Sequence, residues 1–143
     1  MNAGRKQGGF TYLAMLFFVA ITGASLAASG MLWSDSARRE NERELLYVGN
    51  QYREALTKYK TQVGRYPEKL DDLVEKKHLR RLYRDPMTSR TEWGLVEAPE
   101  KAGIIGVYSL AEGVPFKSGN FSEHDRGFEG TRSYQEWRFV ARQ

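Results

Sequence analysis

Residues 10–63 read FTYLAMLFFVAITGASLAASGMLWSDSARRENERELLYVGNQYREALTKYKTQV and contain no proline. The first part, residues 10–33, carries no Asp, Glu, Lys or Arg, and an apolar helix of about 20 residues is long enough to cross a bilayer. The second part repeats apolar residues at steps of three and four, the period of one helix face. These residues are Leu45, Val48, Tyr52, Ala55, Leu56, Tyr59 and Val63. Because Gly64 is well placed to end a helix, the stretch predicts one long helix, transmembrane in residues 10–33 and amphipathic in residues 34–64.

The rest of the chain, residues 65–143, predicts a small α+β head that packs on the amphipathic half of this helix. A short second helix is expected over residues 67–74, with Pro67 in its first turn. Three segments with strand-forming composition predict β-strands, at Thr91–Val96, Gly103–Leu110 and Tyr134–Val140. The expected fold is therefore α+β, a long N-terminal helix packed on a small three-stranded antiparallel sheet. A connection as long as residues 111–133 is usually functional or mobile.

The N-terminus allows three interpretations. Arg5 and Lys6 precede the apolar run, so the positive-inside rule keeps the N-terminus in the cytoplasm and sends the rest of the chain outward. A cleavable secretory signal is one interpretation, because Ser25-Leu26-Ala27 has the small residues that signal peptidase accepts. The apolar run is, however, longer than the hydrophobic region of most such signals. An uncleaved signal anchor is the second interpretation.

The third interpretation comes from residues 4–13, which read GRKQGGFTYL. They resemble the prepilin peptidase site of type IV pilins and type II secretion pseudopilins. In that family a short basic leader ends in glycine, cleavage follows the glycine, and the exposed residue is N-methylated. The resemblance implies a leader over residues 1–9 and a cut between Gly9 and Phe10. Since glycine has no Cβ, its backbone can extend into a protease, and a cut at this position leaves the apolar helix intact.

Two features of the apolar run concern assembly. Most members of the family have Glu as the fifth residue of the mature chain, where this sequence has Ala14. The difference resembles a minor pseudopilin at the filament tip, and a divergent lineage that tolerates alanine is the alternative. Ala20, Ala24 and Ala28 recur at intervals of four, and small residues in such a stripe let helices approach closely in lipid. Small residues are also frequent in spanning helices in general.

Calcium is the cofactor that the resemblance raises. The segment from Tyr66 through Asp85-Pro86-Met87-Thr88 resembles the major pseudopilin of type II secretion, and members of that family bind calcium in a loop equivalent to residues 111–133. The candidate ligands there are Glu123, Asp125 and Glu129, because Ca²⁺ takes carboxylate oxygens. Their spacing matches no EF-hand, and a solvated acidic turn is the alternative.

Charge and composition give little sign of other chemistry. The formal net charge is +4, of which Arg5 and Lys6 supply two units, so no nucleic-acid partner is predicted. His78 lies in a basic stretch with Arg80, Arg81 and Arg84, which indicates a solvated or partner-facing surface. The chain contains no cysteine, and neither a phosphate-binding glycine loop nor a nucleophile with its base is recognisable. The sequence predicts no enzyme.

The resemblance implies a structural pseudopilin of a type II secretion or type IV pilus-like filament. It would lie in the bacterial inner membrane with its head in the periplasm, and Ala14 would make it a minor or tip subunit. The implied partners are other pseudopilins, prepilin peptidase, the inner-membrane assembly platform and membrane lipid. The alternative is a membrane-anchored or secreted ligand-binding module whose sheet and long loop recognise a ligand.

Overall fold

The computed structural model describes residues 8–143, and the side chains of residues 8, 26–32 and 101 are outside the description. Arg5 and Lys6 of the expected leader therefore lie outside the described residues. The elements in chain order are α1 (Gly8–Val63), α2 (Asp71–Glu75), β1 (Gly94–Glu97), η1 (Pro99–Lys101), β2 (Ile104–Tyr108), η2 (Glu123–Phe128), η3 (Tyr134–Glu136) and β3 (Phe139–Val140), where η marks a short 3-10 helix. Internal contacts divide the chain into two units, Met1–Ala37 and Arg38–Gln143.

The predicted long helix is confirmed. α1 continues to Val63 and ends at Gly64, which has a φ of 82°. Glycine adopts this left-handed conformation without steric cost. The Gly64 backbone N–H donates to the Lys60 carbonyl at 2.9 Å, and the Lys60 ammonium donates to the Gly64 carbonyl at 3.1 Å. Both hydrogen bonds satisfy carbonyl or amide groups that a helix end leaves open.

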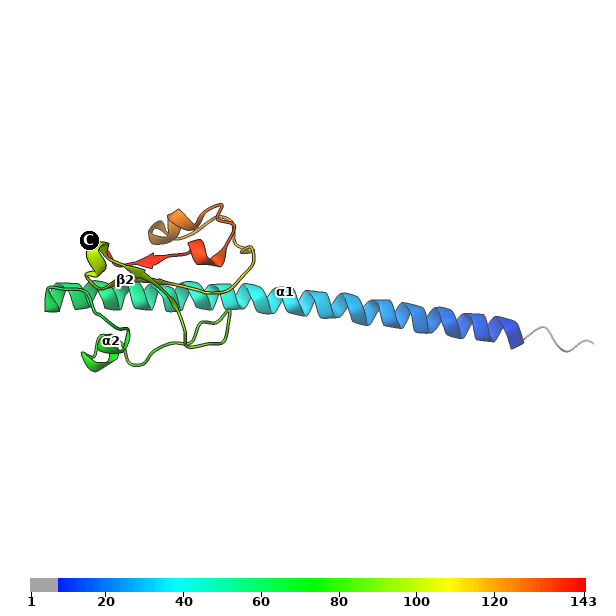
Figure 1. Ribbon diagram of the computed structural model, residues 1–143. Coiled ribbons are helices and arrows are strands. Elements are labelled where there is room, and N and C mark those ends of the chain that lie inside the picture. The colour runs from blue at the N-terminus through cyan, green and yellow to red at the C-terminus, as the bar shows by residue number, and fades with distance from the viewer. Residues whose placement is uncertain (1–7) are drawn as a thin grey trace, which may run out of the picture. The chain divides into compact units, whose positions relative to one another are not determined.

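The three-stranded antiparallel sheet is also confirmed, in the order β1-β2-β3. It packs on the second part of α1, and Figure 1 shows β2 running alongside this helix, with α2 on the opposite side. The core between these elements contains the apolar stripe of α1 and the large side chains of the head. Its fully buried members include Tyr52, Leu56, Leu73, Val107, Tyr134, Trp137 and Phe139.

The third strand is shorter than the predicted Tyr134–Val140. Residues Tyr134–Glu136 form η3 instead, in which the Ser133 hydroxyl accepts a hydrogen bond from the Gln135 backbone N–H at 3.2 Å. Only Phe139–Val140 pairs with β2. The physical reason is a tertiary contact, because the Tyr134 hydroxyl donates to a carboxylate oxygen of Glu42 on α1 at 2.6 Å.

The second helix begins later than predicted, at Asp71 instead of Pro67. The Pro67 carbonyl accepts a hydrogen bond from the Ile104 backbone N–H at 2.8 Å, so this residue belongs to the connection with β2. The Asp72 carboxylate accepts from the backbone N–H groups of Glu68 and Lys69, both at 3.1 Å. These bonds form a turn ahead of α2.

Candidate functional site

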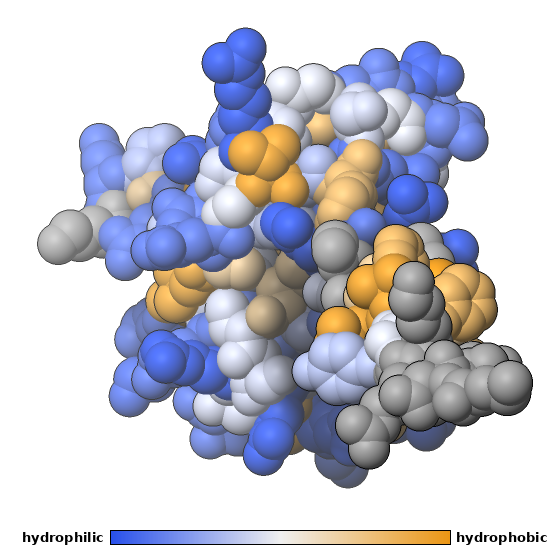
Figure 2. Space-filling model, turned by 90° about the vertical axis from the view of Figure 1, so that its right-hand side faces the viewer, coloured by the Kyte–Doolittle hydropathy of each residue, from blue (hydrophilic) through white to orange (hydrophobic). Residues whose placement is uncertain are grey.

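The first part of α1 exposes a continuous series of large apolar side chains. Each is between 50% and 76% exposed: Phe10, Tyr12, Leu13, Met15, Leu16, Phe17, Phe18, Val19 and Ile21. Figure 2 shows a group of hydrophobic side chains, coloured orange, exposed on one face of the molecule. An exposed apolar surface of this kind marks an interaction site for protein or membrane.

The expected processing and assembly residues lie on this same segment. Gly9 and Phe10 are exposed near the start of α1, and a Cβ added at Gly9 would meet nothing within 4 Å. Ala14, Ala20 and Ala24 are exposed as well, while the side chain of Ala28 lies outside the description. Packing against the described residues therefore does not explain why residue 9 is glycine.

Within the described part of the chain, no helix combines the length and mean hydropathy required of a membrane span.

A buried carboxylate fastens the beginning of the 111–133 loop to α1. Glu42 is 3% exposed and accepts hydrogen bonds from the backbone N–H groups of Phe116 at 2.7 Å and Lys117 at 3.1 Å. It also accepts from the Tyr134 hydroxyl. Burial, followed by the hydrogen bond to Glu42, raises the pKa of Tyr134 to about 12. The tyrosine therefore stays a neutral donor to this carboxylate.

Arg38 completes this attachment from one turn earlier on α1. Its Nη2 donates to the Val114 carbonyl at 3.0 Å and its Nε donates to the Tyr134 hydroxyl at 3.2 Å. The guanidinium also lies 4.8 Å from the centroid of the Phe116 ring. Arg38 and Glu42 thus hold the loop by its backbone on two successive turns of the helix.

A second buried carboxylate fastens the later part of the loop. Asp125 is 4% exposed, and its Oδ1 pairs with Nη1 of Arg53 at 2.8 Å. Its Oδ2 accepts from Asn50 Nδ2 at 3.0 Å and from the Ser122 hydroxyl at 2.9 Å. Arg53 additionally donates to Asn50 Oδ1 at 2.6 Å. Asn50 and Arg53 are one turn apart, so one face of α1 binds η2.

This pairing bears on the calcium candidates. The Asp125 carboxylate is neutralised by a buried guanidinium, whereas Glu123 and Glu129 are exposed. Among the residues that the structure describes, no three His, Cys, Asp or Glu side chains are grouped as metal ligands. Arg53 therefore pairs with Asp125, the carboxylate that the resemblance made a candidate calcium ligand.

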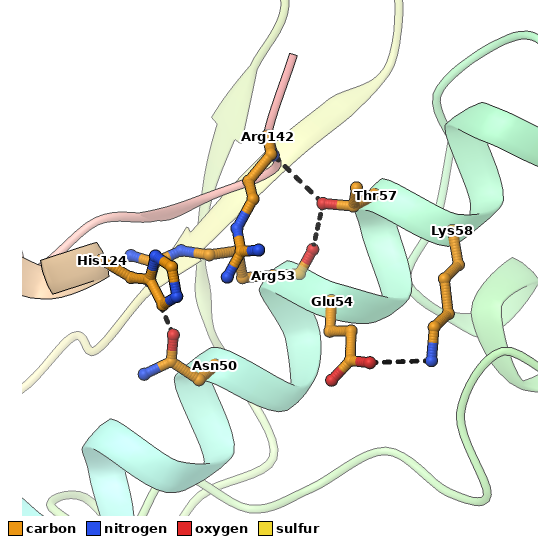
Figure 3. Close-up of a pocket in the computed structure, with 7 residues that line it drawn as sticks. All are labelled: Asn50, Arg53, Glu54, Thr57, Lys58, His124 and Arg142. Atoms are coloured by element: carbon orange, nitrogen blue, oxygen red, sulfur yellow. Dashed lines mark hydrogen bonds and ion pairs between the residues drawn. The ribbon is translucent and has the colours of Figure 1, made fainter. Parts of the chain in front are cut away.

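A groove opens beside this ion pair (Figure 3). Its volume is about 410 Å³, and it is lined by Asn50, Arg53, Glu54, Thr57, Lys58, His124 and Arg142. A neighbouring hollow of about 360 Å³ shares Arg53, His124 and Arg142.

Several residues that line the groove interact with one another or with the neighbouring backbone. Glu54 pairs with Lys58 at 2.8 Å, and this hydrogen bond lowers the pKa of the Glu54 carboxyl. The Arg142 backbone N–H donates to the Thr57 hydroxyl at 3.1 Å, which ties the segment after β3 to α1. The charged groups in the lining are three cations, Arg53, Lys58 and Arg142, and one carboxylate, Glu54, so their balance suits an anionic or polar ligand.

A third carboxylate, Asp85, is fully buried and accepts from the Ser109 hydroxyl at 2.6 Å and from the Met87 backbone N–H at 2.9 Å. Sequence analysis assigned Glu42 and Arg53 no role and named Asp85 only within the segment Asp85-Pro86-Met87-Thr88. It left Asp125 between a calcium ligand and a solvated acidic turn. The signal for Glu42 lay in the helix period, because a step of three back from Leu45 reaches it. Comparison of the chain with protein-family models, with curated proteins and with solved structures found no match to any of them.

Proposed function

We propose that this chain is a structural subunit of a type IV pilin-like filament, a pseudopilin of a type II secretion or related system. The observation that carries the proposal is the series of large apolar side chains that α1 exposes between Phe10 and Ile21. The leader-like sequence around Gly9 directly precedes this surface. The fold, a long helix whose second part packs on a small antiparallel sheet, suits a subunit that presents a head on a helix.

In this proposal the protein catalyses no chemical reaction and acts through helix packing and contacts between heads. Residues 10–33, free of charged side chains, hold it in the bacterial inner membrane, with the N-terminus cytoplasmic and the head periplasmic. Prepilin peptidase cuts after Gly9. The small-residue stripe of Ala20, Ala24 and Ala28 then packs against the helices of other subunits, and the inner-membrane assembly platform supplies the energy. Ala14 in place of Glu favours a minor or tip position.

The test is the chemical nature of the mature N-terminus. Mass spectrometry of the protein from a host with prepilin peptidase should find N-methylated Phe10 and no leader. Gly9→Leu should block this processing and leave membrane insertion intact, because the apolar run is unchanged. Gly119→Leu is the matched control, since a side chain there also meets nothing within 4 Å, and it should be processed normally. A mature chain that starts at Ala28 would contradict the proposal.

The groove beside Arg53 favours a second candidate, a membrane-anchored or secreted ligand-binding module. A hollow of about 410 Å³ is within the size range of small-molecule sites. The same N-terminal measurement separates the candidates. A secreted module starts after the signal cleavage site, and an anchored module keeps the uncut N-terminus, whereas a filament subunit starts at N-methylated Phe10.

A further inference from the structure

A strongly basic surface lies directly after α2. Residues 76–84 read KKHLRRLYR, and the cationic strip is defined here as Lys76, Lys77, Arg80, Arg81 and Arg84. All five of these side chains are exposed, while the other four residues of the segment are buried or half-buried. The segment therefore places every cation outside and every apolar or aromatic residue inside.

The cations of the strip are not neutralised within the head. The ion pairs of the described residues are made by Arg43, Arg53, Lys58 and Arg65, and none includes a member of the strip. Five like charges within nine residues repel one another at low ionic strength. A folded surface that keeps them together without ion pairs attracts an anionic partner and steers its approach.

The backbone under the strip is held firmly in place. The backbone N–H groups of His78 and Leu79 both donate to the Leu73 carbonyl, at 2.8 Å and 2.9 Å. Further along, the Tyr83 backbone N–H donates to the Tyr52 hydroxyl at 2.9 Å, and the Trp93 indole donates to the Tyr83 carbonyl at 2.9 Å. Since the backbone is already ordered, binding has to order the long side chains alone, which lowers the entropic cost of association.

We propose that the cationic strip is a docking surface for an acidic segment of a partner protein. The inference rests on the proposed function for the class of partner, because a filament subunit meets other proteins of its assembly. Arginine favours such a role, since its planar guanidinium binds a carboxylate through two parallel hydrogen bonds. Three of the five cations are arginines.

Two observations favour a protein over a nucleic acid. The segment just before the strip is acidic, with Glu68, Asp71, Asp72 and Glu75, and it would repel a uniformly charged phosphate backbone, whereas a protein can place a cation opposite it. The strip also lacks an open aromatic face. The Tyr83 ring meets the Tyr52 ring edge-on, with centroids 6.1 Å apart, and the Arg81 guanidinium lies 5.6 Å from its centroid. Single-stranded nucleic acids are commonly held by stacking on exposed aromatic rings.

The experiment measures binding of a fluorescent peptide of alternating Glu and Gly to the full-length protein in micelles of a neutral detergent. Fluorescence anisotropy should show binding that weakens as salt is added, and a peptide with Gln in place of Glu should not bind. The combined variant Arg80→Gln, Arg81→Gln and Arg84→Gln should bind the acidic peptide about tenfold more weakly, because three exposed ion pairs are lost.

The matched control removes three exposed arginines elsewhere on the head, by Arg126→Gln, Arg132→Gln and Arg138→Gln. This variant has the same net charge as the strip variant, and its affinity should stay within about twofold of the parent. Equal loss in the two variants would show that net charge, not the strip, binds the peptide, and would overturn the inference. The absence of salt-sensitive peptide binding would do the same.

Single-stranded DNA with the same number of charges is the third probe. The inference expects it to bind more weakly than the acidic peptide, and tighter binding of the DNA would assign the strip to nucleic acid instead. The N-terminus of each variant is measured on the same samples. A strip variant that is processed at Gly9 but binds the peptide like the parent would refute the docking surface alone. An unprocessed parent that binds the peptide normally would refute the proposed function alone.

Discussion

Three buried carboxylates fasten irregular segments of the head. Glu42 and Asp125 attach the two ends of the 111–133 loop to α1, and Asp85 closes the turn before β1. Each carboxylate is at most 4% exposed, and a buried charge is costly unless donors surround it. The hydrogen bonds that compensate for burying these carboxylates also hold the loops in place.

Removal of Asp125 should destabilise the head strongly. Asp125→Ala leaves the Arg53 guanidinium buried without its anionic partner, which costs about 3–5 kcal/mol. The double variant Arg53→Met and Asp125→Leu should lose clearly less, because both charges are removed together. Urea denaturation followed by the fluorescence of Trp93 and Trp137, both buried in the head, measures the free energy of unfolding.

Glu54→Ala is the matched control for this comparison. Glu54 also pairs with a cation on α1, but the side chains of Glu54 and Lys58 are 60% and 58% exposed. An exposed pair of this kind contributes about 0.5 kcal/mol. If Asp125→Ala costs no more than Glu54→Ala, the buried pair does not hold the loop.

Sequence analysis predicted the apolar core positions of α1 but not its buried polar residues. The core positions Tyr52 and Leu56 follow from their helical period and are confirmed. Glu42 and Arg53 are charged, and charged side chains are expected at the surface, even though Glu42 lies one step of three before Leu45. Their burial depends on which loop folds over the helix, and that loop comes from residues 72 or more positions later. Nothing local to α1 encodes that contact.

At the scale of elements, the close contact between α1 and β3 depends on a glycine in α1, Gly49, which has no side chain. A Cβ added at Gly49 would overlap the ring of Phe139, which is fully buried. That ring packs edge-to-face against Phe128, with centroids 5.1 Å apart. Since β3 has only two residues, close approach to the helix contributes much of its attachment.

Gly49→Ala should therefore destabilise the protein, although alanine is favoured over glycine in a helix by about 1 kcal/mol. The methyl group forces the Phe139 ring to move, and overpacking of this kind costs about 1–3 kcal/mol. Phe139→Leu in the Gly49→Ala background should recover part of the loss by making room. The measurement is urea denaturation, with Gly23→Ala as the control because a Cβ there meets nothing within 4 Å. A gain in stability from Gly49→Ala would refute the close contact.

The elements that sequence predicted well are those with a long local signal. α1 was predicted to end at Val63 and does, because its period and the glycine after it agree. β2 falls within the predicted Gly103–Leu110, because Ile104, Ile105 and Val107 are strand-forming residues. α2 and β3 were predicted too long, since Pro67 and Tyr134 each make a hydrogen bond to a distant residue that removes them from the local pattern.

At the scale of the whole molecule, the two units have opposite surface properties. The unit from Arg38 to Gln143 has its own apolar core and buries its large aromatic residues. The unit before it exposes large apolar side chains from Phe10 to Ile21. The need for lipid or partner helices should therefore belong to the first unit alone.

A fragment of residues 35–143 should consequently fold as a soluble monomer. It keeps Arg38 and Glu42, which hold the 111–133 loop, and it keeps Leu45, which is fully buried. Light scattering after size-exclusion chromatography measures its mass, and urea denaturation should show one cooperative transition.

The control is a shorter fragment that begins at Tyr47. It is equally free of the exposed apolar surface, but it lacks Arg38, Glu42 and Leu45. Truncation of a fully buried leucine alone costs about 2–5 kcal/mol, so this fragment should unfold at lower urea concentration or fail to fold. Aggregation of the 35–143 fragment would show that the head depends on earlier residues. Equal stability of the two fragments would show that the contacts made by Arg38 and Glu42 do not hold the loop in solution.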